Sequence, residues 1–166
     1  NMANAPVEMV EASYPVRVEE YGLEPDSEGP GLHRGGLGVR RKIRVLAPDG
    51  GILQIRSGRA SQPPWGLFGG LAGSTCRNVL DPGTPGERVL AGLETMHVPG
   101  GTVYLHVTPG AGGYGPPERR DSTLVGRDVR DGKVSVERAR SVYRVAADAD
   151  GRVDAAATER LRASAN

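Results

Sequence analysis

The sequence predicts an α+β chain, with a Gly/Pro-rich antiparallel β body over residues 1–117 followed by a short helical C-terminal tail over residues 118–166. All 13 prolines and most of the 25 glycines lie at or before residue 117, and helices tolerate the composition of the tail but not that of the body. Apolar and polar residues alternate in the body, as in strands, whereas the tail carries helix-capping residues ahead of apolar positions at helical spacing.

Four segments of the body are expected to be strands. In residues 39–45, odd-numbered positions share one face and even-numbered positions the other, although Arg41 interrupts the apolar side. Asp49-Gly50-Gly51 resembles a hairpin turn because glycine accepts a positive φ, so residues 52–55 are expected to continue as the next strand. Residues 16–21 and 103–107 are the other two candidates.

The long stretch over residues 62–101 is dense in turn-forming residues, and we expect it to be irregular throughout. Irregular segments of this length are uncommon inside an independent domain and are usually functional. We therefore expect this stretch either to carry function or to pack on a partner.

The tail predicts two or three short helices. Asp121 or Ser122 can cap the first, which Gly132 would end, while Ser135 can cap a second and Asp154 a last one. The tail is therefore expected to pack on the body or on a partner.

Composition excludes several function classes. The 166 residues, 17.5 kDa, carry a net charge of +1, which gives no electrostatic reason to expect nucleic acid or an anionic membrane as a partner. The single cysteine, Cys76, excludes an internal disulfide and a cysteine-based zinc site. No two of the three histidines lie at metal-ligand spacing, so no metal site is predicted.

Residues 110–115 satisfy the G-x-G-x-x-G pattern, but a dinucleotide site also needs a helix that begins at the last glycine. Pro116 and Pro117 follow instead, so we expect a glycine-dependent turn at which two backbones approach closely. The glycines to which we assign this structural role are Gly110, Gly112, Gly113 and Gly115.

Two loops could contact a ligand or a partner. His33 and Arg34 lie in a glycine-rich loop and could present an imidazole and a guanidinium to an anion, although an exposed loop histidine without a role is also compatible with this pattern. Trp65, the only tryptophan, is expected to anchor either the core or a partner surface. The candidate substrate- or interface-loop residues are His33, Arg34, Gly35, Gly36, Arg59 and Trp65; no catalytic residue is assigned.

The order of several motifs resembles the C-terminal part of hydantoinase B, of the hydantoinase B/5-oxoprolinase family. These motifs follow one another over nearly the whole chain, and they are residues 14–18, 21–27, 34–39, 63–66, 109–115 and 128–137 with Tyr143. The family also includes subunits of acetone and acetophenone carboxylases.

The resemblance implies a cytoplasmic, heteromeric enzyme in which an A-type subunit uses ATP and Mg²⁺ to phosphorylate the substrate carbonyl oxygen. Expected partners are this ATP-binding subunit and the remaining part of the B-type subunit, which could hold a metal; this chain itself is expected to bind no cofactor.

The chain is then expected to be a C-terminal segment or small subunit of an enzyme that hydrolyses cyclic amides. Three alternatives remain open: a small subunit of a ketone carboxylase, a non-catalytic assembly module, and an independent small enzyme that uses Cys76 or His33.

Overall fold

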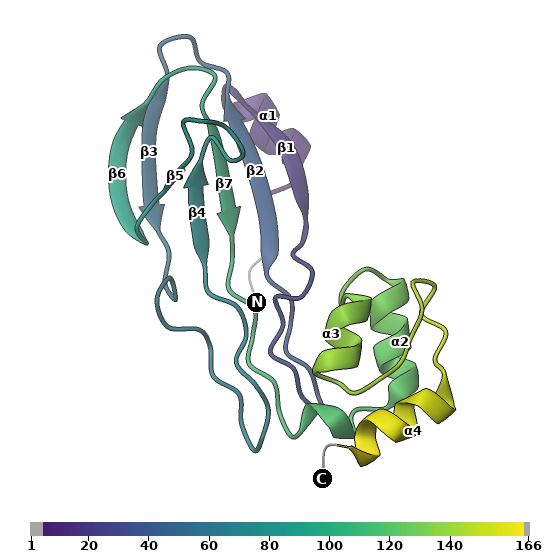
Figure 1. Cartoon of the computed structure of the whole chain (residues 1–166). Coiled ribbons are helices and arrows are strands. Elements are labelled where there is room, and N and C mark those ends of the chain that lie inside the picture. Colours follow the sequence, from purple (N-terminus) through teal and green to yellow (C-terminus); the bar gives the residue numbers. More distant parts are fainter. Residues whose placement is uncertain (1–4, 165–166) are drawn as a thin grey trace. The chain divides into compact units, whose positions relative to one another are not determined.

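The computed structural model describes residues 5–164 and confirms the α+β class. The chain folds as two compact units, each built from separate stretches of sequence (Figure 1). Unit 1 comprises the chain up to Gly22 together with Val39–Ala60 and Cys76–Thr108, and unit 2 comprises Leu23–Gly38, Ser61–Thr75 and the chain from Pro109 onward. The division at residue 117 that the sequence suggests stays a prediction.

Unit 1 is built from two antiparallel sheets and one short helix. A five-stranded sheet has the order β1-β2-β7-β4-β5, and β3 pairs with β6 in a second sheet (Figure 1). The bounds of these elements are α1 Val7–Ser13, β1 Val16–Leu23, β2 Val39–Val45, β3 Gly51–Arg56, β4 Arg77–Leu80, β5 Arg88–Val89, β6 Leu93–Val98 and β7 Val103–Val107.

The turn at residues 49–51 forms, but the hairpin expected around it is wrong. Gly50 has a φ of +74° and donates its N–H to the carbonyl of Ala47 at 3.0 Å. The strands on either side do not pair, because both edges of β2 are taken by β1 and β7 while β3 pairs with β6. The turn therefore carries the chain from one sheet to the other.

The expectation of an irregular stretch over residues 62–101 is also wrong, since β4, β5 and β6 lie within it. These strands are short, and glycine and proline separate them, so no single window shows a long alternating pattern. Pairing with β7 fixes β4, pairing with β3 fixes β6, and β5 pairs with β4 at the edge of the sheet. The sheets of unit 1 share an apolar core that includes Ile55, Leu80, Leu90 and Val98.

The helices of unit 2 begin at the capping residues that the sequence predicts. The side chains of Asp121, Ser135 and Asp154 each accept a backbone N–H at the start of a helix. These helices are α2 Ser122–Arg130, α3 Val136–Ser141 and α4 Ala155–Ala163, and a 3₁₀ turn, η1 Pro117–Arg119, precedes them. Their core consists of Val125, Val129, Val134, Ala139, Tyr143 and Val145.

A buried carboxylate joins this helical part to the segment that begins unit 2. Glu28 is fully buried, and its Oε1 accepts a hydrogen bond from Arg138 Nε at 2.8 Å and another from the Tyr143 hydroxyl at 3.0 Å. Arg138 also donates to the backbone carbonyl of Glu28 at 3.0 Å. Burial, together with the Glu28 charge, raises the pKa of the Tyr143 phenol, which therefore remains a donor.

We predict that Arg138→Met destabilises the chain by about 3 kcal/mol, because it leaves the Glu28 carboxylate buried without its cation. This is the lower end of the usual range, since Arg138 keeps some contact with solvent. Urea unfolding measures the change. Arg140→Met is the matched control, because Arg140 is exposed on the same helix, and its effect should stay within about 0.5 kcal/mol. Equal effects of the two substitutions would contradict the role of Glu28.

Among the described residues, no helix has the length and apolar character needed to cross a membrane.

Candidate functional site

Three glycine-rich segments of unit 2 pack against one another through their backbones. They lie around residues 29–36, 65–73 and 110–115, and a Cβ atom added to several of their glycines would collide with main-chain atoms of a neighbouring segment. A side chain at Gly110 would overlap the carbonyl of Ser27, and one at Gly112 would overlap the carbonyl of Trp65. Residues 110–115 thus make the close backbone approach expected from the glycine pattern, and no helix opens at Gly115.

Hydrogen bonds between the segments satisfy the backbone groups that this packing buries. His33 and Tyr114 exchange two backbone hydrogen bonds, of 3.0 and 2.9 Å. On the other side of Tyr114, Leu67 donates its N–H to the carbonyl of Gly113 and accepts one from Gly115, both at 2.9 Å. The backbones of His33, Tyr114 and Leu67 are therefore held side by side.

Apolar and aromatic side chains project from this rigid backbone into solvent. The Phe68 ring lies 5.2 Å from that of Tyr114, and the His33 ring lies 6.1 Å from it on centroid distances. Phe68 is 77% exposed and Tyr114 47%, and Leu67 is exposed as well. We call His33, Leu67, Phe68 and Tyr114 the aromatic face.

A tight turn holds Phe68 in place. Its φ is +51°, that of Gly69 is +89°, and Gly70 donates to the carbonyl of Leu67 at 2.9 Å. A non-glycine residue in the left-handed region costs about 1 kcal/mol or more. The fold thus tolerates an unfavourable backbone conformation at Phe68, whose side chain contributes little to the core.

Arg34 binds a carboxylate within its own chain. Its Nε and Nη2 donate to the two oxygens of Asp128 at 2.8 and 3.0 Å, and Arg120 Nη2 donates to the same carboxylate at 3.0 Å. Its own hydrogen bonds to Asp128 raise the pKa of the Arg34 guanidinium, which stays charged. Arg34 therefore ties the first glycine segment to α2, and its predicted contact with a substrate or partner stays a prediction.

The other predicted loop residues fall into both units. Gly35 and Trp65 belong to the glycine segments of unit 2: the backbone of Gly35 packs tightly against Ala111, and the Trp65 side chain is exposed. Gly36 is in the same loop with open space around it. Arg59 lies in unit 1, where its φ is +63° and its carbonyl accepts the N–H of Cys76 at 3.0 Å. The site role of each stays a prediction.

Sequence reasoning missed Leu67, Tyr114 and the partners of the arginines. One signal was available, because Phe68 and Tyr114 are aromatic residues inside glycine runs of a chain with only 4% aromatics. The pairing of Arg34 with Asp128 joins residues 94 positions apart, and no local pattern indicates it.

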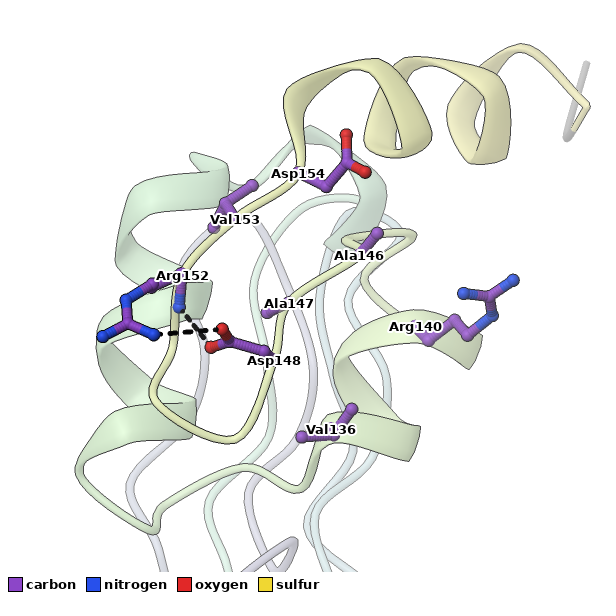
Figure 2. Close-up of a pocket in the computed structure, with 8 residues that line it drawn as sticks. All are labelled: Val136, Arg140, Ala146, Ala147, Asp148, Arg152, Val153 and Asp154. Atoms are coloured by element: carbon purple, nitrogen blue, oxygen red, sulfur yellow. Dashed lines mark hydrogen bonds and ion pairs between the residues drawn. The ribbon is translucent and has the colours of Figure 1, made fainter.

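A pocket of unit 2, of about 380 Å³, is lined by four apolar and four charged residues (Figure 2). Asp148 Oδ1 accepts the backbone N–H groups of Asp150 and Arg152 at 3.0 and 2.9 Å. The Arg152 guanidinium pairs with Asp150 at 2.9 Å. The acidic residues of this turn thus form local contacts within the chain. Within residues 5–164, no three His, Cys, Asp or Glu side chains lie close enough together to hold a metal ion.

Comparison with known proteins identifies the family. Residues 1–117 match the Hydantoinase B/oxoprolinase family, and the chain is 37% identical to the caprolactamase subunit beta of Pseudomonas jessenii, over 95% of this chain and 28% of that one. The chain belongs to the hydantoinase B/oxoprolinase family, which confirms the resemblance seen in the sequence.

Two further comparisons agree with this assignment. The crystal structure of the ATP-dependent caprolactamase from Pseudomonas jessenii matches with a TM-score of 0.81 and 33% identity, over 95% of this chain and 28% of that chain. The acetophenone carboxylase delta subunit of Aromatoleum aromaticum is 29% identical, over 95% of this chain and 28% of its own length. The chain thus spans little more than a quarter of the length of these relatives, both of which are named as enzyme subunits.

We predict that Gly112→Ala destabilises the chain by about 3 kcal/mol or more, because the added methyl group meets the rigid backbone of Trp65. Thermal unfolding measures the change. Gly36→Ala is the control, since nothing lies within 4 Å of its added Cβ and its effect should stay within about 1 kcal/mol. A mild effect at Gly112 would show that the segments are not held by backbone contact.

Proposed function

We propose that this chain is the C-terminal segment or a small subunit of a hydantoinase B-type enzyme that hydrolyses cyclic amides with ATP, and that it completes the B-type subunit within a heteromeric complex. The observation that carries this proposal is the aromatic face, which is held on a rigid backbone in a chain that spans 28% of the length of its caprolactamase relative. Membership of the family supports the proposed reaction, and the aromatic face supports the proposed packing against the rest of the B-type subunit.

The aromatic face suits packing against protein better than it suits bond making. Its neighbouring cation, Arg34, is neutralised by Asp128, so what the face presents to solvent is mainly apolar surface with the Tyr114 hydroxyl and the His33 imidazole at its edge. Clustered aromatics on a preformed backbone are typical of interface anchors, because little entropy is lost when they are buried. The occupant that we propose for this face is the remaining part of the B-type subunit.

The ATP-dependent chemistry is placed on the partners. An A-type subunit binds ATP and Mg²⁺ and phosphorylates the amide oxygen of the substrate, which converts a poor electrophile into a reactive one. The B-type subunit then carries hydrolysis, and any metal that it uses is held by its remaining part. No step is assigned to a metal or cofactor on this chain. The complex is proposed to be cytoplasmic.

A second candidate is a subunit of a ketone carboxylase, which the 29% identity to the acetophenone carboxylase subunit favours. The higher identity to the caprolactamase subunit, 37%, supports amide hydrolysis as the leading proposal.

Purified complex should separate these candidates. We expect the complex to open cyclic amides in an ATP-dependent reaction, which is measured by chromatographic detection of the ring-opened amino acid. Turnover of a ketone that requires hydrogen carbonate would favour the carboxylase. A chain that purifies alone, with no partner in its native extract, would overturn the assembly proposal itself.

Phe68→Ser should lower the recovery of assembled complex from the native cell at least tenfold, because it removes the more exposed aromatic ring of the Phe68–Tyr114 pair. The measurement is the amount of complex at its full mass. Ile52→Ser is the matched control. Ile52 is 78% exposed on β3 of unit 1, and its substitution removes an exposed apolar side chain outside the aromatic face. Normal assembly of the Phe68 variant would exclude the aromatic face as the interface.

A further inference from the structure

A buried asparagine organises a polar network on the five-stranded sheet of unit 1. Asn78 is only 1% exposed. Its Oδ1 accepts the Tyr104 hydroxyl at 2.7 Å and His106 Nδ1 at 2.8 Å, and its Nδ2 donates to Ser57 Oγ at 2.8 Å. Burying an amide is costly unless it is bonded at both ends, and here both ends are bonded.

This network fixes one form of His106. Because Asn78 Oδ1 is an acceptor, Nδ1 of His106 carries the proton, and Nε2 of the neutral ring is then left with a free lone pair. Among the described residues, no hydrogen bond to Nε2 is found. Burial and the nearby Arg41 charge lower the pKa of His106, which therefore stays neutral at neutral pH.

Arg41 lies directly beside this ring. It faces His106 across the pairing of β2 with β7, and its guanidinium lies 4.8 Å from the centre of the Tyr21 ring, which holds it by a cation–π contact. This is the arginine that interrupts the apolar alternation of β2. A cation on the half-buried face of a strand lowers the stability of the fold. Binding of an anion would account for the presence of Arg41 at this position.

A pocket of about 270 Å³ opens between these groups, lined by Val39, Arg41, His106 and Thr108. The volume is several times the ~30 Å³ that one water occupies in the liquid. The Thr108 Oγ1 accepts the Val39 N–H at 2.7 Å, which orients the hydroxyl. The pocket thus combines a cation, a neutral hydrogen-bond acceptor and a hydroxyl.

We propose that this pocket binds a small oxyanion that carries a proton of its own, of which inorganic phosphate is the simplest example. The fork of Arg41 binds two oxygens of the anion. The proton of the anion bridges a third oxygen to Nε2 of His106, and the Thr108 hydroxyl lies within the same pocket. The anion can be a free phosphate or the singly protonated phosphoryl group of a larger molecule.

The test is a titration of the 166-residue chain with inorganic phosphate, followed through the imidazole ¹⁵N resonances. We expect His106 to show the Nδ1–H form and its Nε2 resonance to shift along a saturating curve, while His33 and His97 stay constant. Sodium chloride at matched ionic strength should give no such curve. The titration is repeated with a phosphate monoester at about pH 6, where part of the monoester still carries a proton. A saturating shift of the same resonance supports a phosphoryl group as the ligand, and a shift with phosphate alone supports the free anion.

Arg41→Gln should weaken phosphate binding at least tenfold. Arg40→Gln is the matched control, because Arg40 is the neighbouring residue on the opposite face of β2, where it pairs with Glu20. Where the amide spectrum shows that Arg41→Gln alters the fold, Arg41→Lys replaces it, and binding should again weaken because the fork is lost. Absence of a saturating shift, or equal affinity in the Arg40 and Arg41 variants, would overturn the proposal.

Discussion

Direct contact between glycine backbones is the constraint on which unit 2 depends. Its three glycine segments come so close that main-chain amides and carbonyls fill the space that side chains occupy in other cores. Buried backbone groups must be paired, and here they pair with one another across the segments. The result is a rigid scaffold that buries little apolar area of its own, so its stability must come from elsewhere in the unit.

Two buried carboxylates hold the helical part of the unit against that scaffold. Glu28 joins the first glycine segment to α3 across 110 positions of sequence, and Asp128 joins it to α2 across 94. An ion pair in the interior contributes little net free energy but penalises any arrangement that separates the charges. Together these pairs specify how the helices lie on the glycine segments, and they explain why Arg34, a candidate ligand contact in the sequence, is bonded within the chain.

Local signals in the sequence were sufficient for part of the fold. The strand at Val103–Val107 and the helices capped by Ser135 and Asp154 follow from alternation and capping, which a few neighbouring residues define. Strands β4 to β6 could not be predicted in this way. β4 and β6 are short and are selected by distant partners, β7 and β3, and β5 has only two residues, which pair with β4. The same limit applies to the sites: the loop of His33 was visible, whereas its contact with Tyr114 and the bond from Asn78 to His106 exist only after folding.

The aromatic residues of this chain fall into two groups, buried tyrosines that stabilise the fold and exposed rings that are available for binding. Within residues 5–164, only the aromatic side chains of Tyr104 and Tyr143 point inward, and each donates its hydroxyl to a buried polar group, Asn78 or Glu28. The only phenylalanine and the only tryptophan remain in solvent. A chain with so few aromatics would gain about 2 kcal/mol from burying either one, and Phe68 is instead held outward in a strained turn. Exposure that the fold could avoid, and that costs energy to maintain, is best explained by a surface that becomes buried on assembly.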